Sequence, residues 1–144
     1  MTSKNFPKHL LERFISCNSK IRLATLASEQ EFLNLAGKIN AAQLQLILAI
    51  GTCENCSMKY LAQILGSSPA NISQMIKRLQ VKKFVSCTRD VTDRRASQVR
   101  LLSKGQKIYQ AHRQHVLRVT KQWFAKMSHD EQLFFLEIWE RLCQ

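Results

Sequence analysis

Two short helical patterns, separated by one glycine, constrain the fold of this chain more than any other feature. Over residues 58–65, and again over 68–80, apolar side chains recur at positions i, i+3, i+4 and i+7. The two sets are Met58, Leu61, Ala62 and Leu65, then Ile72, Met75, Ile76 and Leu79. This spacing places each set on one face of an α-helix. Gly66 can end the first helix, and a serine at 67 or 68 followed by Pro69 can begin the second. The sequence therefore predicts a helix-turn-helix.

The apolar period changes directly after this unit. Residues 84–89 form a short run rich in β-branched and aromatic side chains, which is typical of a strand. Residues 90–96 are a polar loop, and 98–102 resume a strand pattern. The sequence thus predicts a β-hairpin immediately after the second helix.

Most of the remaining chain is predicted to be helical. Apolar spacings of three and four residues predict helices over 8–35, 41–50, 104–126 and 129–143. Asn40 is the expected N-cap of the second of these and Gly51 its expected end, while Ser103 and Ser128 begin patterns typical of capping boxes. With 4 Gly and 2 Pro in 144 residues, a turn-rich β fold is disfavoured. The apolar bulk of the last helix indicates that the chain ends pack on each other or on a second copy.

The positive charge of the chain is concentrated in one segment. The formal net charge is +12. Residues 77–107 hold ten Lys or Arg and two acids, a net charge of +8. Such an excess predicts a polyanionic partner, with nucleic acid favoured over an anionic membrane surface. A solvated basic face is the alternative explanation of the charge alone.

The helix predicted over 68–80 suits the major groove of DNA. Its apolar face is expected to pack into the core, and its other face is small and polar near the start and basic near the end. The side-chain amides of Asn and Gln carry a donor and an acceptor that can pair with those of adenine in that groove. The positive charges of Lys and Arg suit contacts to phosphates. The expected contacts of this helix are Ser68, Ala70, Asn71, Ser73, Gln74, Lys77 and Arg78. In the hairpin, Arg94 and Arg95 suit the narrow minor groove, and phosphate contacts are expected from Arg89, Arg100, Lys82 and Lys83.

At these residues the chain resembles the MarR family of dimeric winged helix-turn-helix transcriptional regulators. The resemblance covers residues 40–125, and its most specific part is the wing, where the family has Asp, two residues and Asp-x-Arg, then a strand ending Leu-Thr-x-x-Gly. The matching residues are Asp90, Asp93 and Arg95, then Leu102 and Gly105, with Ser103 in place of the threonine. One position departs from the family pattern, because Lys83 stands where members usually have glycine. Since that position often requires a positive φ, we expect a strained or altered helix exit there.

The resemblance implies a mainly α fold with a two-stranded β-wing. It implies a DNA-binding lobe over 36–102 and dimerisation helices over 8–35 and 103–144. It further implies that Arg95 enters the minor groove, held by Asp93, and that a homodimer binds a palindromic double-stranded DNA operator with half-sites about 10 bp apart. The implied function is a transcriptional regulator, most often a repressor, that responds to a small ligand, an oxidant or a metal.

The five cysteines leave the response to oxidants open. An odd count argues against a disulfide framework, so reduced thiols are expected. Cys17 is a candidate sensor, although its place in an apolar stripe favours a buried side chain. Cys53 and Cys56 have the spacing of a redox pair or half a zinc site, but no further ligands follow, which favours two ordinary thiols.

Other sensing groups are weaker candidates. His112 and His115 lie one turn apart on a predicted helix, where a metal could bind both, but surface or dimer-contact histidines are the favoured interpretation. A cleft between the first and fifth helices could admit a small aromatic anion, attracted by Arg13, Arg22, Arg113 or Arg118. No metal or other cofactor is expected.

Other classes of function fit less well. The sequence lacks the βαβ context of a thioredoxin-like enzyme, a catalytic triad pattern and a phosphate-binding glycine loop, so an enzyme, including a thiol redox protein using Cys53 and Cys56, is disfavoured. A non-specific architectural or RNA-binding protein, and a winged helix used for protein contacts, remain the alternatives. With no signal-peptide pattern and no apolar run of about 18 residues, we expect a cytoplasmic protein without a membrane partner.

Overall fold

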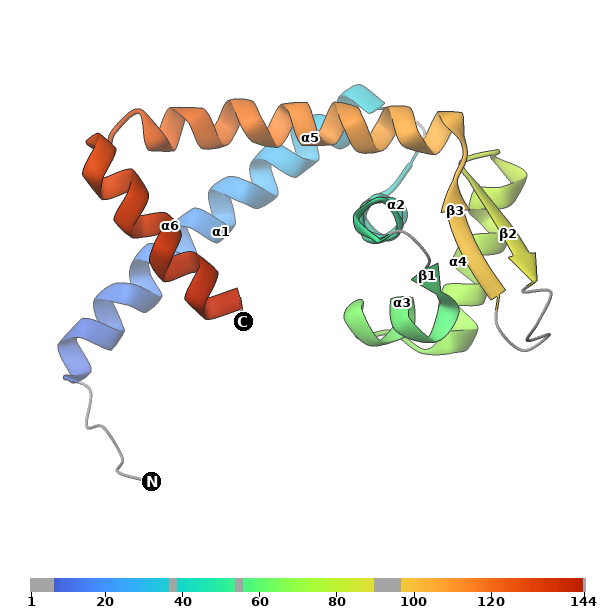
Figure 1. The fold of residues 1–144 in the computed structure, drawn as a ribbon, viewed down its shortest axis with the longest axis horizontal. Helices are drawn as coiled ribbons and strands as arrows, with labels where there is room; N and C mark the ends of the chain where they lie inside the picture. Colours follow the sequence, from blue (N-terminus) through green and yellow to red (C-terminus); the bar gives the residue numbers. More distant parts are fainter. Residues whose placement is uncertain (1–6, 37–38, 54–55, 90–96, 144) are drawn as a thin grey trace. The chain divides into compact units, whose positions relative to one another are not determined.

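The computed structural model describes residues 7–36, 39–53, 56–89 and 97–143, and it is mainly helical (Figure 1). In chain order the elements are α1 (Lys8–Ala36), α2 (Ala41–Thr52), β1 (Cys56–Ser57), α3 (Met58–Ile64), α4 (Pro69–Val81), β2 (Val85–Arg89), β3 (Ser97–Leu101), α5 (Ser103–Phe124) and α6 (His129–Cys143). The chain divides into two compact units, Met1–Leu46 and Ile47–Gln144. In the described ranges no helix has the length and apolar character needed to cross a membrane.

The first unit contains α1 and the beginning of α2. Asn40 caps α2 as predicted, because its Oδ1 accepts from the backbone N–H of Gln43 at 2.9 Å while the Gln43 side chain reaches back to the Asn40 N–H. This reciprocal pair is a capping box with glutamine in the third position. The buried side chains of the unit are Phe32, Ile39, Gln43, Leu44 and Leu46. Most of the remaining apolar side chains of α1 are exposed, so α1 has little core of its own.

The second unit is built on a three-stranded antiparallel sheet in the order β1-β3-β2. Cys87 of β2 and Cys56 of β1 both pair with Val99 of β3, one from each side. The strands lie beside α4 (Figure 1). The predicted hairpin is therefore confirmed in its described parts, and β1 is an additional strand that the sequence did not indicate. The core of this unit is Ile47, Ile50, Cys56, Leu61, Ala62, Ile72, Ile76, Leu79, Phe84, Val85 and Val99.

Two helices of this unit end in the same backbone motif. After α3, the N–H of Ser67 donates to Ala62 O at 2.9 Å and the N–H of Gly66 to Gln63 O at 3.2 Å, with Gly66 at φ 57°. These two bonds and the left-handed residue define a Schellman motif. Gly66 therefore ends the helix as the sequence predicts.

The motif after α4 has the same bonds but a lysine in the left-handed position. The N–H of Phe84 donates to Leu79 O at 2.9 Å, and that of Lys83 to Gln80 O at 2.9 Å. Lys83 has φ 60° and is the non-glycine residue with positive φ among those described. The strained exit expected from the lysine is therefore observed. Phe84 and Leu79, which flank the motif, are both buried and supply its usual apolar contact.

Two predicted helix boundaries, the end of α2 and the start of α5, are wrong. Helix α2 does not end at Gly51 but continues to Thr52. A side chain at Gly51 would overlap the ring of Tyr109 in α5, so this glycine serves close packing within the second unit. Helix α5 starts at Ser103 itself, with Leu102 as N-cap and no side-chain capping bond. The expected capping box from Ser103 is therefore absent.

The end of α5 and the start of α6 are held by polar and aromatic contacts. The side-chain amide of Gln132 donates to Phe124 O at 3.0 Å and to Met127 O at 3.2 Å. The capping box from Ser128 is confirmed, because Glu131 Oε2 accepts from the Ser128 N–H at 2.8 Å and Ser128 Oγ accepts from the Glu131 N–H at 3.3 Å. The ring of Phe135 meets that of Phe124 edge-on at 5.9 Å. These contacts fix the turn between the two helices.

Candidate nucleic-acid interface

Helix α4 is fixed in place from its first turn. Ser68 is its N-cap, with Oγ accepting from the N–H of Asn71 at 3.2 Å, and Pro69 is its first residue. Proline suits this position because its missing N–H would have no partner inside the helix. Ile72, Ile76 and Leu79 are buried. The opposite face of α4 is thereby turned outward.

The residues predicted to contact DNA from α4 lie mostly on this outward face. Ser68, Ala70, Asn71, Gln74, Lys77 and Arg78 are exposed, and Ser73 is half-buried. The Asn71 side chain is held by a hydrogen bond from Nδ2 to Ser67 Oγ at 2.9 Å. An exposed amide group thus stands next to the small, exposed side chain of Ala70. This surface has the size and polarity that major-groove readout needs.

The wing is described only in part. The backbone of Arg89 ends β2. The side chain of Arg89 and the loop residues Asp93, Arg94 and Arg95 lie outside the described residues, so their predicted roles stay predictions. Basic side chains near the base of the wing and the end of α4 are exposed, namely Lys82, Lys83, Arg100, Lys104 and Lys107. These exposed groups add positive charge to the unit that contains α4.

One basic residue has a structural contact that the sequence did not indicate. Lys104, in the first turn of α5, donates from Nζ to Lys82 O at 3.0 Å. Its ammonium also lies 4.6 Å from the centroid of the buried Phe84 ring. Lys82 is the C-cap of α4, where a cation interacts favourably with the helix dipole. Lys104 therefore ties the end of α4 to the start of α5.

The joint between α4 and α5 is close-packed at the backbone as well. The N–H of Leu102 donates to Phe84 O at 2.9 Å. A Cβ at Gly105 would overlap that same carbonyl oxygen. Glycine at 105, which the family pattern also has, is thus required by the approach of α5 to Phe84. These contacts hold the residues that follow α4 against the start of α5.

The cysteines differ from the expectation of reduced thiols. Cys53 and Cys56 are joined by a disulfide with a Cα–Cα separation of 5.9 Å. The spacing of the two cysteines allowed a redox pair, but two ordinary thiols were favoured because β1, which begins with Cys56, was not predicted. Cys17 is exposed in the described chain, contrary to the buried side chain expected. The stripe that contains it is left uncovered by the helix's own unit.

The histidine and effector candidates also change. His112 and His115 are buried rather than on the surface, and Arg118 Nη2 lies 3.3 Å from Nδ1 of His115. Among the described residues no three His, Cys, Asp or Glu side chains are grouped as a metal would need. An open cavity of about 400 Å³ lies in the first unit, lined by Gln30, Leu33, Asn34, Ile39, Asn40 and Ala41. None of the arginines expected to attract an aromatic anion lines it.

Comparison with known proteins agrees with this architecture. Residues 38–96 match the model of the MarR family. The DNA-bound FabT of Streptococcus pneumoniae is 20% identical, with a TM-score of 0.77, and the match covers 93% of this chain and 95% of that one. A MarR/EmrR family transcriptional regulator from Acinetobacter sp. ADP1 is 21% identical, with a TM-score of 0.68, over 91% and 92% of the two chains.

A third solved structure concerns regulation. BpsR of Bordetella bronchiseptica, whose DNA binding is regulated by 6-hydroxynicotinic acid, is 18% identical with a TM-score of 0.55, over 87% of this chain and 99% of that one. No curated protein matches the sequence.

The fold and the exposed helix define a winged helix-turn-helix protein. Residues 38–96 match the MarR family model, and over 91–93% of its length the chain shares the fold of the two solved structures compared above. The resemblance predicted from the wing and helix-turn-helix residues is thereby confirmed.

Proposed function

We propose that this chain is a sequence-specific DNA-binding repressor of transcription that acts in the cytoplasm as a homodimer on a palindromic operator. The observation that carries the proposal is the outward face of α4. It offers Asn71 and Gln74 for base edges and Lys77 and Arg78 for phosphates, while Ile72, Ile76 and Leu79 anchor the opposite face. The DNA complex of FabT, which has the same fold, supports DNA as the partner.

A contrast between two neighbouring side chains of α4 tests this proposal. The full chain is first used to select binding sites from a pool of random duplexes. On the selected site, Gln74→Ala should weaken binding by about 10- to 100-fold and leave non-specific binding unchanged, because a base contact is lost. Lys77→Ala should weaken both kinds of binding and lower the salt slope by about one, because a phosphate contact is lost. Failure to enrich any site, or equal effects of Gln74→Ala on both DNAs, contradicts the proposal and favours an architectural protein.

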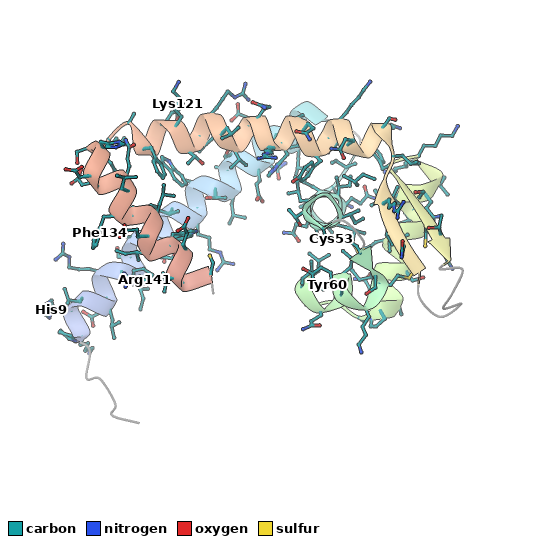
Figure 2. The ribbon with its side chains drawn as sticks, viewed as in Figure 1. His9, Cys53, Tyr60, Lys121, Phe134 and Arg141 are labelled. Atoms are coloured by element: carbon teal, nitrogen blue, oxygen red, sulfur yellow. A yellow bond between two sulfur atoms is a disulfide. The ribbon has the colours of Figure 1, made fainter. Side chains whose placement is uncertain are left out.

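The exposed apolar side chains of α6 support a second copy of the chain as partner. No residue of this helix is buried. Phe134 and Leu142 are 62% and 73% exposed, and Phe134 is labelled on α6 in Figure 2. Leaving this much apolar surface in water is unfavourable by about 25 cal/mol per Å². Independently of α6, α1 exposes Phe14, Ile15 and Leu23 by more than 60% each.

Sedimentation equilibrium tests the homodimer. Phe134→Asp places a charge on the apolar face and should raise the dimer dissociation constant by at least about tenfold. Phe134→Leu keeps the face apolar and should leave the chain dimeric. A wild-type chain that is monomeric at micromolar concentration, or two variants with equal dissociation constants, contradicts the homodimer.

The proposal includes release of DNA on binding a small effector. Support comes from the regulation of BpsR by 6-hydroxynicotinic acid and from the cavity between the end of α1 and the start of α2. Repeating the DNA-binding measurement with a panel of small aromatic acids tests this part. Unchanged affinity with every acid contradicts an effector of that class.

A further inference from the structure

The junction between α2 and β1 carries a disulfide that the DNA-binding face does not use. Cys53 directly follows the last residue of α2, and Cys56 is the first residue of β1. Their Cα atoms are 5.9 Å apart, within the range of about 4.4–6.8 Å that is usual for disulfides. The backbone separation at this junction is therefore one that a disulfide can bridge.

The two cysteines differ in access. Cys56 is fully buried, whereas Cys53 is half-buried and is labelled at the end of α2 in Figure 2. Cys53 is consequently the more accessible of the two residues. This asymmetry suits thiol–disulfide exchange, in which the accessible thiol reacts first and the buried thiol then resolves the mixed disulfide.

The surroundings of Cys56 also accommodate the reduced form. Its Sγ lies 3.8 Å from Ala49 O, 3.8 Å from Ile50 O and 3.9 Å from Cys53 O. In the dithiol, the Cys56 S–H can donate to one of these carbonyls at the end of α2. We take Cys53 as the nucleophile because it is the more accessible of the two residues. Both oxidation states thus have a place in the fold.

We propose that Cys53 and Cys56 form a reversible oxidation site whose state sets how firmly α2 is tied to the winged sheet. The oxidant class is a low-molecular-weight disulfide, RSSR. The Cys53 thiolate attacks one sulfur of RSSR, forming a mixed disulfide and releasing one RS⁻. Cys56 then loses its proton to water and attacks Cys53 Sγ, which forms the Cys53–Cys56 bond and releases the second RS⁻. Two protein thiols are oxidised and one RSSR is reduced to two RSH.

The position of Cys56 connects this chemistry to the DNA-binding face. Cys56 pairs with Val99 of β3, the returning strand of the wing. The next residue, Ser57, caps α3 by accepting from the N–H of Tyr60 at 3.1 Å. A bond from Cys56 to Cys53 therefore restrains the start of the helix-turn-helix and one wing strand against the end of α2. On the proposed function, on which this step rests, the oxidised chain binds its operator more tightly than the dithiol.

The test uses a variant in which Cys17, Cys87 and Cys143 are replaced by serine, so that the pair alone reacts. The variant is equilibrated in buffers of varied reduced and oxidised glutathione, the thiols are blocked, and the intact mass is measured. We expect one reversible transition in which two thiols react together. Hydrogen exchange of the β1 and α3 amides should slow in the oxidised form, and its Tm should rise by about 4 °C or more. Two thiols that stay free in fully oxidised glutathione, or equal exchange in both forms, overturn the proposal.

Operator affinity is then measured for both forms. The oxidised form should bind about fivefold or more tightly. The Cys53→Ser variant cannot form the disulfide and should bind the operator equally with and without oxidant. Cys56→Ala removes the other sulfur atom and replaces Cys53→Ser in the test if that variant folds poorly. If oxidation changes hydrogen exchange but leaves the operator affinity unchanged, the link to the DNA-binding face is overturned. Absence of any selective DNA binding in both forms contradicts the proposed function instead, and leaves the oxidation site to be judged by mass and exchange.

Discussion

At the scale of single residues, Lys83 shows how a fold can be kept despite an unfavourable side chain. The Schellman motif after α4 needs a left-handed residue, and Lys83 adopts φ 60° to provide it. For a residue with a Cβ this conformation costs roughly 1–2 kcal/mol. The apolar contact of Phe84 with the end of α4, and the bond of Leu102 N–H to Phe84 O, keep the backbone in that conformation. The sequence predicted this position because the family pattern has glycine there.

Lys83→Gly should therefore stabilise the protein. Relief of the left-handed strain exceeds the added entropy of the unfolded chain, so we expect the free energy of unfolding to rise by about 0.5–1 kcal/mol. Lys82→Gly is the matched control, because it removes the same charge from the adjacent residue, whose φ is −78°. Chemical denaturation of the two variants decides the point. If the free energy of unfolding of Lys83→Gly is no higher than that of Lys82→Gly, the backbone at Lys83 is not strained.

At the scale of elements, helix starts were predicted well where a side chain could act as cap. Asn40, Ser68 and Ser128 cap their helices as expected. Ser103 does not, because Leu102, whose N–H is bound to Phe84 O, is the N-cap and the helix begins one residue earlier than the pattern indicated. Similarly, α2 passes through Gly51 because that glycine makes room for the Tyr109 ring. Both errors arise from contacts between residues far apart in sequence, which local patterns do not contain.

The capping box of α6 predicts a dependence of stability on pH. The Ser128 N–H, and then the Ser128 hydroxyl, lower the pKa of Glu131 below its ordinary value of 4.5. A lowered pKa in the folded state means that the stabilisation is fully present above that ordinary value and is lost as pH falls through the lowered pKa. Glu131→Gln should thus lose less stability than wild type on acidification from pH 6 to pH 3. Glu137→Gln, in the middle of the same helix, should behave like wild type. Equal acid dependence of all three proteins contradicts the capping contribution.

At the scale of the whole molecule, the class of fold followed from the sequence because each local pattern agreed with it. Two amphipathic helices, a basic hairpin and long flanking helices predict a winged helix-turn-helix, and α3, α4, β2 and β3 confirm it within the described residues. Strand β1 was missed because two residues carry no periodic signal. The Cys53–Cys56 pair was considered but disfavoured, because β1 was not predicted, and the burial of His112 and His115 depends on packing around α5. For the candidate site, the sequence identified the outward face of α4 but not the role of Lys104 in holding that helix.

The measurement that tests the proposed function most directly is a footprint of the full chain on DNA upstream of its own gene, with excess non-specific competitor. We predict two protected half-sites about 10 bp apart, related by inverted symmetry, with two chains bound per duplex. Protection that the competitor removes, or a single protected half-site with one chain bound, contradicts a dimeric sequence-specific regulator.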